Sequence, residues 1–249
     1  MFKATLTDVD LLKNSIPIIS EIIDEGLFKV DKSGISLLSP DRTMVSVIDF
    51  RLHAAAFESY EVEGEQEMGL NMANFVSVLR RVKSTDKVTL ELSGKTNKLK
   101  ITVEGDSRRV FEIPLLDIKA EKPPIEQLAF PGRVEVESRL IEEGIADADV
   151  VGDSVVFELK PEVFSMRARG DVSSAELAIA KGDSGMLKIQ AKESLAARYP
   201  LEYLKKMIKA NKLSNQMSIE LGNDYPMRLD FRSIDKLSLS FILAPRVEE

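Results

Sequence analysis

The chain has few side chains that could carry out chemistry. It contains no cysteine, which excludes disulfides, thiol nucleophiles and cysteine-bound metals. Its only histidine, His53, follows an apolar strand-like run, where a surface or strand-end histidine is the ordinary interpretation. Neither a P-loop nor a dinucleotide-binding glycine loop is present. Catalysis would depend on carboxylates, and nothing singles out a pair among the 41 Asp and Glu residues. We therefore expect no catalytic residue, no metal site and no cofactor.

The residues that stand out are cations in two segments. The net charge is −7, which by itself argues against nucleic acid. Segments 71–83 and 200–212 nevertheless carry +3 each, and −7 minus their +6 leaves −13 for the remainder. At 100° per residue, each segment places its apolar residues on one arc and its cations opposite. These cations are Arg80, Arg81 and Lys83, and then Lys205, Lys206, Lys209 and Lys212.

One cationic helix face is ordinarily just solvated. Its recurrence at the same phase in two segments indicates a functional surface. Lys and Arg on a helix contact phosphates without reading bases, so such a surface predicts salt-sensitive, sequence-neutral binding of nucleic acid.

The two segments belong to an internal repeat with one offset of 129 residues. The stretch 86–92 (DKVTLEL) matches 215–221 (NQMSIEL), and 71–83 falls on 200–212. The same offset superposes Leu27-Phe28 on Val156-Phe157. This pattern indicates duplication of a single α+β unit.

Each half is predicted to contain antiparallel strands with two helices covering one face. In the first half we expect helices over about 8–22 and 71–83, and strands at 2–6, 27–30, 35–38, 44–52, 68–70, 86–92 and 111–113. In the second half we expect helices over about 138–148 and 200–212, and strands at 134–136, 155–159, 163–168, 176–180, 187–189, 215–221 and 237–243. Asp8 and Ser138 are predicted N-caps, strands 68–70 and 187–189 are predicted to lead into the second helices, and Pro17 is predicted to kink the first helix.

The halves are joined by a charged, proline-rich stretch whose clearest part is 119–124 (KAEKPP). Proline favours extended backbone, so this stretch is interpreted as a linker. The predicted boundaries are a first domain over 1–114, a connecting loop over 115–131 and a second domain over 132–249. The loop also carries Ile125, Leu128 and Phe130, which a simple spacer would not need.

The sequence resembles the PCNA family of DNA sliding clamps, most closely its archaeal members, along essentially its whole length. The most specific segment is the tail, 243–249 (LAPRVEE), which is close to the family's C-terminal pattern. Supporting segments are 34–37 (GISL), 68–72 (MGLNM), 114–117 (PLLD) and 126–128 (EQL). Each is weak alone, and their order and spacing make the match specific.

The resemblance implies a duplicated two-domain clamp fold in which three subunits close head-to-tail into a ring. Helices would line the hole and sheets the outside. Such a homotrimer would act as a non-enzymatic DNA polymerase processivity factor in the cytoplasm. It would encircle duplex DNA and tether DNA polymerase, clamp loader, flap endonuclease and DNA ligase by short peptide motifs.

The resemblance also assigns residues to three surfaces. Lys13 would join the seven cations above in facing DNA. The subunit interface would use edge strands with Arg108, Arg109, Val110, Phe111, Ile113, Ser174, Glu176, Leu177 and Ile179, where Arg108 and Arg109 would face acids such as Glu176. The partner-peptide pocket would comprise Met44, Val45, Val47, Ile125, Leu128, Phe130, Pro226, Ile242, Ala244 and Pro245.

The sequence departs from the family pattern in segment 138–149. Family members usually carry basic residues there, whereas this chain has a net charge of −3. That acidic helix keeps open a second hypothesis, a subunit of a heterotrimeric or checkpoint-type clamp. A third hypothesis is an acidic α+β hydrolase that uses paired carboxylates.

Overall fold

The computed structural model describes residues 1–94, 96–119 and 122–246. Residues 120–121 of the predicted linker and residues 247–249 of the family-like tail lie outside the described residues. Within the described ranges, no helix combines the length and the apolar character needed to cross a membrane. In the same ranges, no group of three or more His, Cys, Asp or Glu residues could hold a metal ion.

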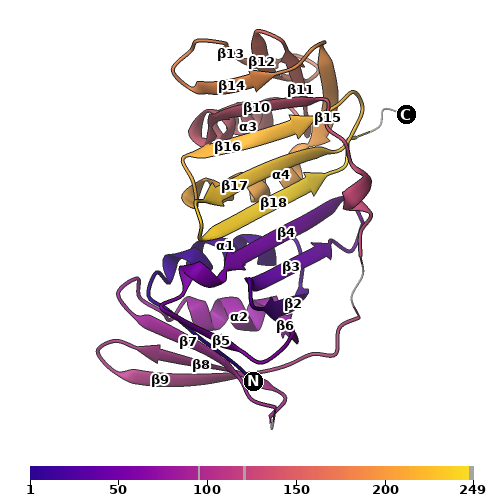
Figure 1. Ribbon diagram of the computed structural model, residues 1–249. Coiled ribbons are helices and arrows are strands. Elements are labelled where there is room, and N and C mark those ends of the chain that lie inside the picture. Colours follow the sequence, from indigo (N-terminus) through magenta and orange to yellow (C-terminus); the bar gives the residue numbers. More distant parts are fainter. Residues whose placement is uncertain (95, 120–121, 247–249) are drawn as a thin grey trace. The chain divides into compact units, whose positions relative to one another are not determined.

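The chain forms two compact units (Figure 1). The first comprises Met1–Arg42, Ile48–Pro123 and Ser233–Leu239, and the second comprises Thr43–Val47, Pro124–Arg232 and Ser240–Glu249. Each is therefore built mainly from one half of the sequence, with short segments contributed by the other half.

Among its described residues, the first half contains two α-helices and nine strands. The helices are α1 (Asp10–Ser20) and α2 (Met72–Leu79), which contact each other. The strands are β1 (Phe2–Leu6), β2 (Glu25–Asp31), β3 (Gly34–Pro40), β4 (Ser46–His53), β5 (Ser59–Val62), β6 (Gln66–Asn71), β7 (Lys87–Leu92), β8 (Lys98–Glu104) and β9 (Arg108–Pro114). In one sheet, the hydrogen-bonded strands follow the order β5-β1-β7-β8-β9. In a second sheet, the strands of this half follow the order β4-β3-β2-β6.

The second half repeats this plan. Its helices are α3 (Ser138–Val151) and α4 (Leu201–Met207), and α4 continues as a 3-10 helix over Ile208–Lys212. Its strands are β10 (Gly132–Glu137), β11 (Ser154–Lys160), β12 (Val163–Arg169), β13 (Ser174–Ala180), β14 (Met186–Gln190), β15 (Leu195–Pro200), β16 (Gln216–Leu221), β17 (Met227–Ser233) and β18 (Leu237–Leu243). Their orders are β14-β10-β16-β17-β18 and β13-β12-β11-β15.

The predicted internal repeat is confirmed by the element boundaries. Strand β2 begins at residue 25 and β11 at residue 154, a difference of 129. The same difference separates the starts of β3 and β12, β6 and β15, β7 and β16, β8 and β17, and β9 and β18. The two strand orders correspond one to one, so topology as well as sequence is duplicated.

The prediction that strand 187–189 leads into the second helix is wrong. That stretch lies in β14, which pairs antiparallel with β10, and its counterpart in the first half is β5. The strand that leads into α4 is β15, which was not predicted because its sequence (LAARYP) lacks β-branched residues. The 129-residue offset applied to β6 would have found it.

Both predicted N-caps are wrong. Helix α1 begins after Val9 without a side-chain cap, because the carboxylate of Asp8 pairs with Lys236 at 3.0 Å. Ser138 is the first residue of α3, and its hydroxyl donates to the carbonyl of Ser214 at 2.9 Å. Helix α1 runs through Pro17, and the hydroxyl of Ser20 donates to the Pro17 carbonyl.

Aromatic rings occupy the centre of each core. In the second unit, Phe157 makes edge-to-face contacts with Phe164 and Tyr199, both at 5.7 Å between ring centroids. In the first unit, Phe28 makes similar contacts with Phe50 and Phe75 at 6.4 Å. All six rings are almost fully buried. Such pairs add stabilisation beyond the area that they bury. Phe75 lies on α2, so its contact with Phe28 also holds that helix against β2.

Tyr199 makes the second unit sensitive to alkaline pH. Its side chain is fully buried, and its hydroxyl donates to the carbonyl of Tyr225 at 2.8 Å. Burial raises the pKa of this phenol, with a smaller contribution from Asp224. The folded state therefore favours the protonated phenol. This stabilisation is complete below the ordinary phenol pKa of about 10 and is lost as the pH rises further.

We expect Tyr199→Phe to lower the free energy of unfolding by about 1 kcal/mol at neutral pH, because it removes one hydrogen bond. Between about pH 9 and pH 11 the variant should lose less stability than the unsubstituted chain. Urea unfolding at both pH values measures the difference. Equal losses in the two proteins would contradict the role of Tyr199. The pKa of Tyr60 is also raised by burial, so Tyr60 should account for part of the alkaline sensitivity that remains in the variant.

Candidate nucleic-acid interface and partner surfaces

The first predicted cationic face lies at the end of α2. Asn71 caps this helix by accepting a hydrogen bond from the amide of Asn74 at 3.0 Å. Met72, Phe75, Val76 and Leu79 are buried along one side, as the periodicity predicts. Helix α2 ends at Leu79, and Arg80 and Arg81 follow directly with exposed side chains. Within the described ranges, neither guanidinium forms a side-chain hydrogen bond or an ion pair.

Lys83 differs from these arginines because it has a partner. Its ammonium donates to the carboxylate of Asp106 at 2.7 Å. That hydrogen bond raises the pKa of Lys83 and lowers that of Asp106. Both side chains are exposed, so the pair contributes little to stability. A phosphate could still attract Lys83, in competition with Asp106.

A buried carboxylate holds the end of this cationic segment in place. The side chain of Asp86 is 3% exposed, and it accepts from the Lys83 amide at 3.0 Å and from the Arg109 guanidinium at 2.7 Å. Arg109 also donates to the carbonyl of Arg81 at 2.8 Å. One ion pair therefore joins the turn after α2 to strand β9. The resemblance implied that Arg109 faces an acid such as Glu176. It did not predict Asp86, which is a partner of Arg109 within the same unit.

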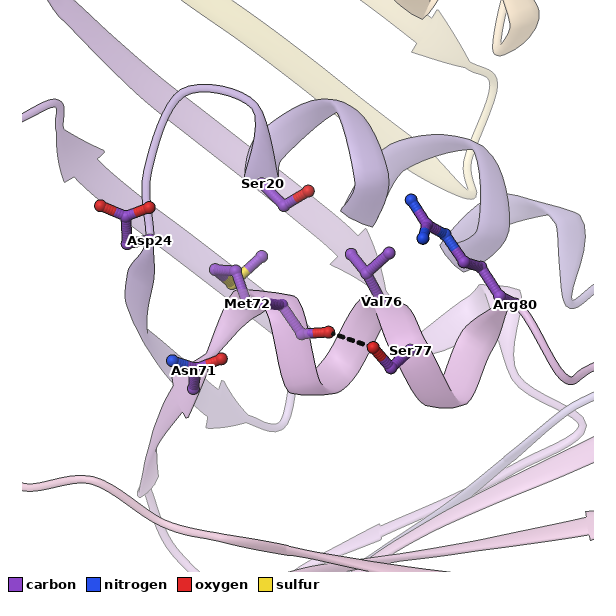
Figure 2. Close-up of a pocket in the computed structure, with 8 residues that line it drawn as sticks. Ser20, Asp24, Asn71, Met72, Val76, Ser77 and Arg80 are labelled. Atoms are coloured by element: carbon purple, nitrogen blue, oxygen red, sulfur yellow. Dashed lines mark hydrogen bonds between the residues drawn. The ribbon is translucent and has the colours of Figure 1, made fainter.

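Arg80 lines a pocket of about 250 Å³ beside α2 (Figure 2). Its other lining residues are Ser20, Asp24, Asn71, Met72, Ala73, Val76 and Ser77. Asp24 pairs with Arg42 at 3.0 Å, and the Ser77 hydroxyl donates to the Ala73 carbonyl at 2.8 Å. These partners occupy Asp24 and Ser77, whereas the guanidinium of Arg80 has no ion pair or side-chain hydrogen bond within the described residues. The pocket therefore indicates no particular small molecule.

Lys13 on α1 is the remaining predicted cation of the first unit. Its ammonium donates to the Ser84 hydroxyl at 3.4 Å and lies 3.8 Å from the carboxylate of Asp10. Ser84 in turn donates to Asp10 at 2.7 Å. The structure thus places Lys13 close to the turn that follows Lys83, with Asp10 as its counter-ion.

The second predicted cationic face lies on α4 and the 3-10 helix that follows it. Lys205, Lys209 and Lys212 are exposed, and buried Leu201, Leu204, Met207 and Ile208 form the opposite side. Lys206 lies over the ring of Tyr203, with its ammonium 5.5 Å from the ring centroid. The helical segment is shorter than predicted in α form, but it keeps the lysines on one face.

The predicted interface strands are both edge strands of their units. Strand β9 is the outermost strand of one sheet, and β13 is the outermost strand of another. In the described residues, neither strand has a second strand partner within its unit. The amide of Lys181 donates to the Glu162 carbonyl at 2.8 Å, and that of Gly170 donates to Ser173 at 2.9 Å. Hydrogen-bonded residues alternate in an antiparallel ladder. The amides of Ser174, Glu176 and Ala178 therefore point to the open edge, whereas that of Ala180 donates to the carboxylate of Asp183 at 2.7 Å.

Strand β9 presents the same arrangement. The amides of Leu115 and Gly105 donate to Asn97 and Ser107, which makes the odd-numbered residues of β9 the ones bonded to β8. The amides of Arg108, Val110 and Glu112 consequently point to the open edge. Val110 is an exposed apolar residue there. Arg108 lies 3.7 Å from Glu104, and Glu112 pairs with Lys98 at 2.8 Å.

The residues predicted to bind partner peptides gather in the second unit. The amide of Ala244 donates to the Val45 carbonyl at 2.9 Å, which places segment 43–47 beside the end of β18. Phe130 packs edge-to-face on Tyr225 at 5.9 Å. Met44 is 59% exposed and Ile242 is buried. The others are half-buried: Val45, Val47, Ile125, Leu128, Phe130, Pro226, Ala244 and Pro245. All ten residues belong to the second unit, and nine of them keep part of their apolar surface accessible.

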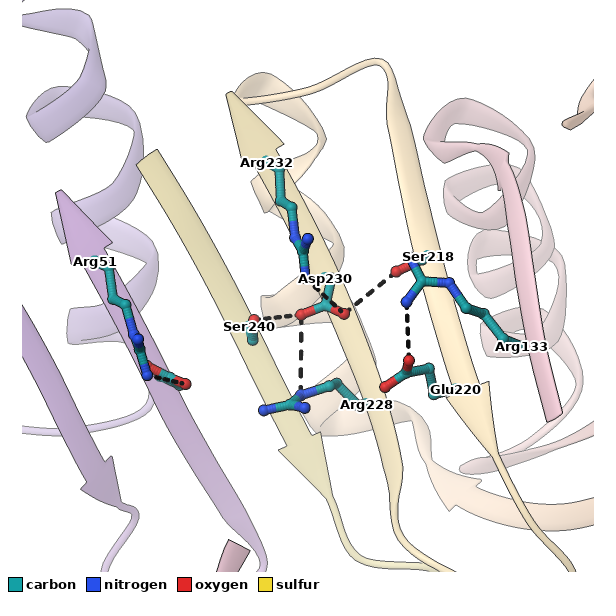
Figure 3. Close-up of polar contacts among 9 residues, drawn as sticks. Arg51, Arg133, Ser218, Glu220, Arg228, Asp230, Arg232 and Ser240 are labelled. Carbon is teal, nitrogen blue, oxygen red and sulfur yellow. Dashed lines mark hydrogen bonds and ion pairs between the residues drawn. The ribbon is translucent and has the colours of Figure 1, made fainter. Parts of the chain in front are cut away.

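One polar cluster of the second unit was not predicted from the sequence (Figure 3). Asp230 on β17 is 4% exposed, and it accepts from the hydroxyls of Ser218 and Ser240 on the neighbouring strands. The guanidinium groups of Arg228 and Arg232 lie 3.9 and 3.8 Å from its carboxylate. The signal was an acid between arginines at i−2 and i+2, which one face of a strand brings together. The cluster satisfies a buried charge and holds the sheet together.

Comparison with protein families identifies the architecture. The family model for the N-terminal domain of proliferating cell nuclear antigen matches residues 1–122, and the model for its C-terminal domain matches residues 125–246. The chain belongs to the PCNA family. The resemblance inferred from the C-terminal pattern and the internal segments is thereby confirmed, as is the two-domain fold.

Curated relatives agree with this assignment. A DNA polymerase sliding clamp of Thermococcus fumicolans is 36% identical over 230 residues, which cover 92% of each chain. A DNA polymerase sliding clamp of Pyrococcus abyssi shows the same identity and coverage. The similarity therefore extends across both PCNA domains.

Solved structures show the same fold. A crystal structure of PCNA from Thermococcus kodakaraensis matches with a TM-score of 0.93 at 26% identity, covering 99% of this chain and 100% of that one. A chain of the PCNA2–PCNA3 complex from Sulfolobus tokodaii matches with a TM-score of 0.91 at 26% identity and the same coverage. One PCNA fold therefore occurs in proteins described singly and in a complex of two different PCNA chains.

Proposed function

We propose that the chain is a subunit of a ring-shaped sliding clamp that encircles duplex DNA and holds DNA polymerase on it. The observation that carries this proposal is the recurrence of a cationic helical face in two duplicated units of the PCNA fold. Cations on helices bind phosphates without base recognition, which suits a protein that moves along DNA. Its role is that of a scaffold without catalysis. We infer that it acts in the cytoplasm, as an archaeal-type clamp that works on DNA there.

The assignment of surfaces follows from this proposal. Lys13, Arg80, Arg81, Lys83, Lys205, Lys206, Lys209 and Lys212 face the DNA. Domains over 1–114 and 132–249, joined by a loop over 115–131, form each subunit. The connecting loop and the apolar surface of the second unit receive peptides from the polymerase, clamp loader, flap endonuclease and ligase.

A homotrimer is the assembly that the two edges support best. Strands β9 and β13 each leave alternate amides open, and pairing between neighbouring subunits would satisfy them and remove two exposed edges. A head-to-tail contact of this kind closes into a ring when its rotation allows. Light scattering at micromolar concentration should give three times 27.7 kDa. A monomeric mass would favour the alternative assembly, a heterotrimer. The Sulfolobus complex of two different PCNA chains and the acidic α3 support that alternative.

Topological binding distinguishes a clamp from an ordinary DNA-binding protein. After loading onto nicked circular DNA by a clamp loader, the protein should remain bound through gel filtration in moderate salt. Cutting the circle should release it, because a ring slides off a free end. Equal retention on circular and linear DNA would contradict the proposal, and so would failure to remain on circles despite a trimeric mass.

Partner binding should depend on the apolar residues of the connecting loop. Ile125 and Leu128 are half-buried, whereas Glu126 between them is exposed. Loss of two aliphatic anchors from one apolar surface should weaken binding of a peptide from the C-terminal tail of the cognate polymerase about tenfold or more. We expect this result for Ile125→Ala/Leu128→Ala in fluorescence anisotropy.

The matched control is Glu126→Ala, which changes the same loop without removing an apolar contact and should leave the affinity nearly unchanged. Equal effects of the two variants would indicate that loop conformation, rather than apolar contact, determines binding. If neither variant changed the affinity, the peptide would bind at a site other than the connecting loop.

A further inference from the structure

The helical segments of the two units differ in charge. In the first unit, α1 is neutral and residues 72–83 carry +3 from Arg80, Arg81 and Lys83. In the second unit, residues 201–212 carry four lysines and one glutamate, also +3. Helix α3 carries one arginine and four acidic residues, which makes −3 and cancels that charge. The repeat therefore preserves the cations, but only one unit keeps a net positive charge on its helical segments.

The acids of α3 contact the cationic segment directly. The two carboxylate oxygens of Asp149 lie 2.9 and 3.1 Å from the ammonium of Lys205. Glu142 accepts from the side-chain amide of Asn211 at 2.6 Å. Both acids lie on the exposed side of α3, since the buried side is formed by Ile141, Gly144, Ile145 and Ala148.

These contacts change what an incoming phosphate meets. Lys205 and Asp149 remain 48% and 43% exposed, so the pair contributes little to stability, but it puts a negative charge beside the lysine. Near a protein surface, like charges a few ångströms apart repel each other, and salt only partly screens this repulsion. A DNA phosphate approaching Lys205 must therefore displace Asp149 or accept that repulsion. Arg80 and Arg81, within the described ranges, have no carboxylate partner.

We propose that the two units contact DNA unequally, with Arg80 and Arg81 supplying the principal phosphate contacts and Asp149 and Glu142 acting as built-in counter-ions for the second unit. This inference rests on the proposed function and specifies it. A closed trimer would then hold DNA by three strong patches and three weak ones. The acids lower the affinity of the second unit and so limit the total attraction that opposes sliding.

The test measures the affinity of the intact assembly for a short fluorescent duplex by anisotropy, over a series of salt concentrations. Arg80→Gln/Arg81→Gln should weaken binding roughly tenfold at low salt and flatten the plot of log affinity against log salt, because phosphate contacts are lost. Lys205→Gln/Lys212→Gln removes the same charge and should weaken binding by a distinctly smaller factor. Glu142→Gln/Asp149→Asn should strengthen binding several-fold and steepen the plot.

A matched control separates the effect of where the acids lie from the effect of the change in net charge. Glu61→Gln/Glu65→Gln neutralises two exposed acids on β5 and the turn after it, away from the helices. It should change affinity far less than the α3 substitutions. Equal effects of the two acidic double variants, or equal losses from the two cationic ones, would overturn the inference. If the unsubstituted assembly were neither retained on circular DNA nor bound to the duplex, the proposed function itself would fail.

Discussion

Ala178→Pro should convert the assembly into monomers of 27.7 kDa without unfolding them. Ala178 is exposed on β13, and its amide points to the open edge of that strand. Proline lacks an N–H and is tolerated on an edge strand where that N–H faces outward. The substitution therefore removes a hydrogen bond that only a neighbouring subunit would make, and its ring obstructs the approach of another strand.

The neighbouring position supplies a control with the same chemistry. The amide of Leu177 belongs to the ladder between β12 and β13, so Leu177→Pro removes a bond within the unit. That variant should lose thermal stability as well as assembly, whereas Ala178→Pro should keep the circular dichroism of the folded chain. Light scattering and thermal melting measure both properties. A trimeric mass for Ala178→Pro would exclude β13 from the subunit interface.

Removing the carboxylate of Asp86 should be the most damaging single change near the cationic end of α2. Asp86→Ala leaves the Lys83 amide without its acceptor and the Arg109 guanidinium without its counter-ion. Breaking a fully buried pair from one side typically costs about 3–5 kcal/mol. Arg109 is 32% exposed and can reach water, so we expect a loss of about 2–3 kcal/mol in the free energy of unfolding.

Urea unfolding tests this value, with Asp106→Ala as the matched control. Asp106 is an acid of the same neighbourhood that pairs with Lys83, but it is exposed, and its removal should give no measurable change. The double variant Asp86→Ala/Arg109→Ala should lose less stability than the two single losses added together, because the residues share one interaction. Additive losses would show that the two side chains act independently.

The sequence was sufficient for features that recur locally. Helix α2 and the α4 segment follow from apolar residues at helical spacing. The 129-residue offset, found in the sequence, relates six strands of the second half to strands of the first. The same reasoning located both cationic faces, since charge and periodicity are read from short windows. The PCNA resemblance rested on the order of short motifs, and the comparison confirmed it over both domains.

Features that depend on distant residues were not predicted. Asp8 looked like an N-cap, but Lys236 takes its carboxylate. Asp86 was predicted only as the first residue of strand 86–92, yet Arg109 makes it a buried anchor. The amide of Ala178 is known to face the open edge only once the register between β12 and β13 is known. No local sequence pattern supplies that register. In each case, the partner is chosen by tertiary structure.

If subunits pair through β9 and β13 as proposed, the alternation of open amides would also restrict errors in assembly. In an antiparallel pair, every second residue of a strand forms hydrogen bonds to its neighbour, and side chains alternate between the two faces with the same period. A mistaken register therefore preserves the hydrogen bonds and the side-chain faces only if it shifts by two residues. Such a shift would displace the neighbouring subunit by roughly 7 Å along the strand. Three junctions can close into a ring only when their displacements cancel, so a single slipped junction would leave an open arc. Closure of the proposed ring would thus itself select the correct register.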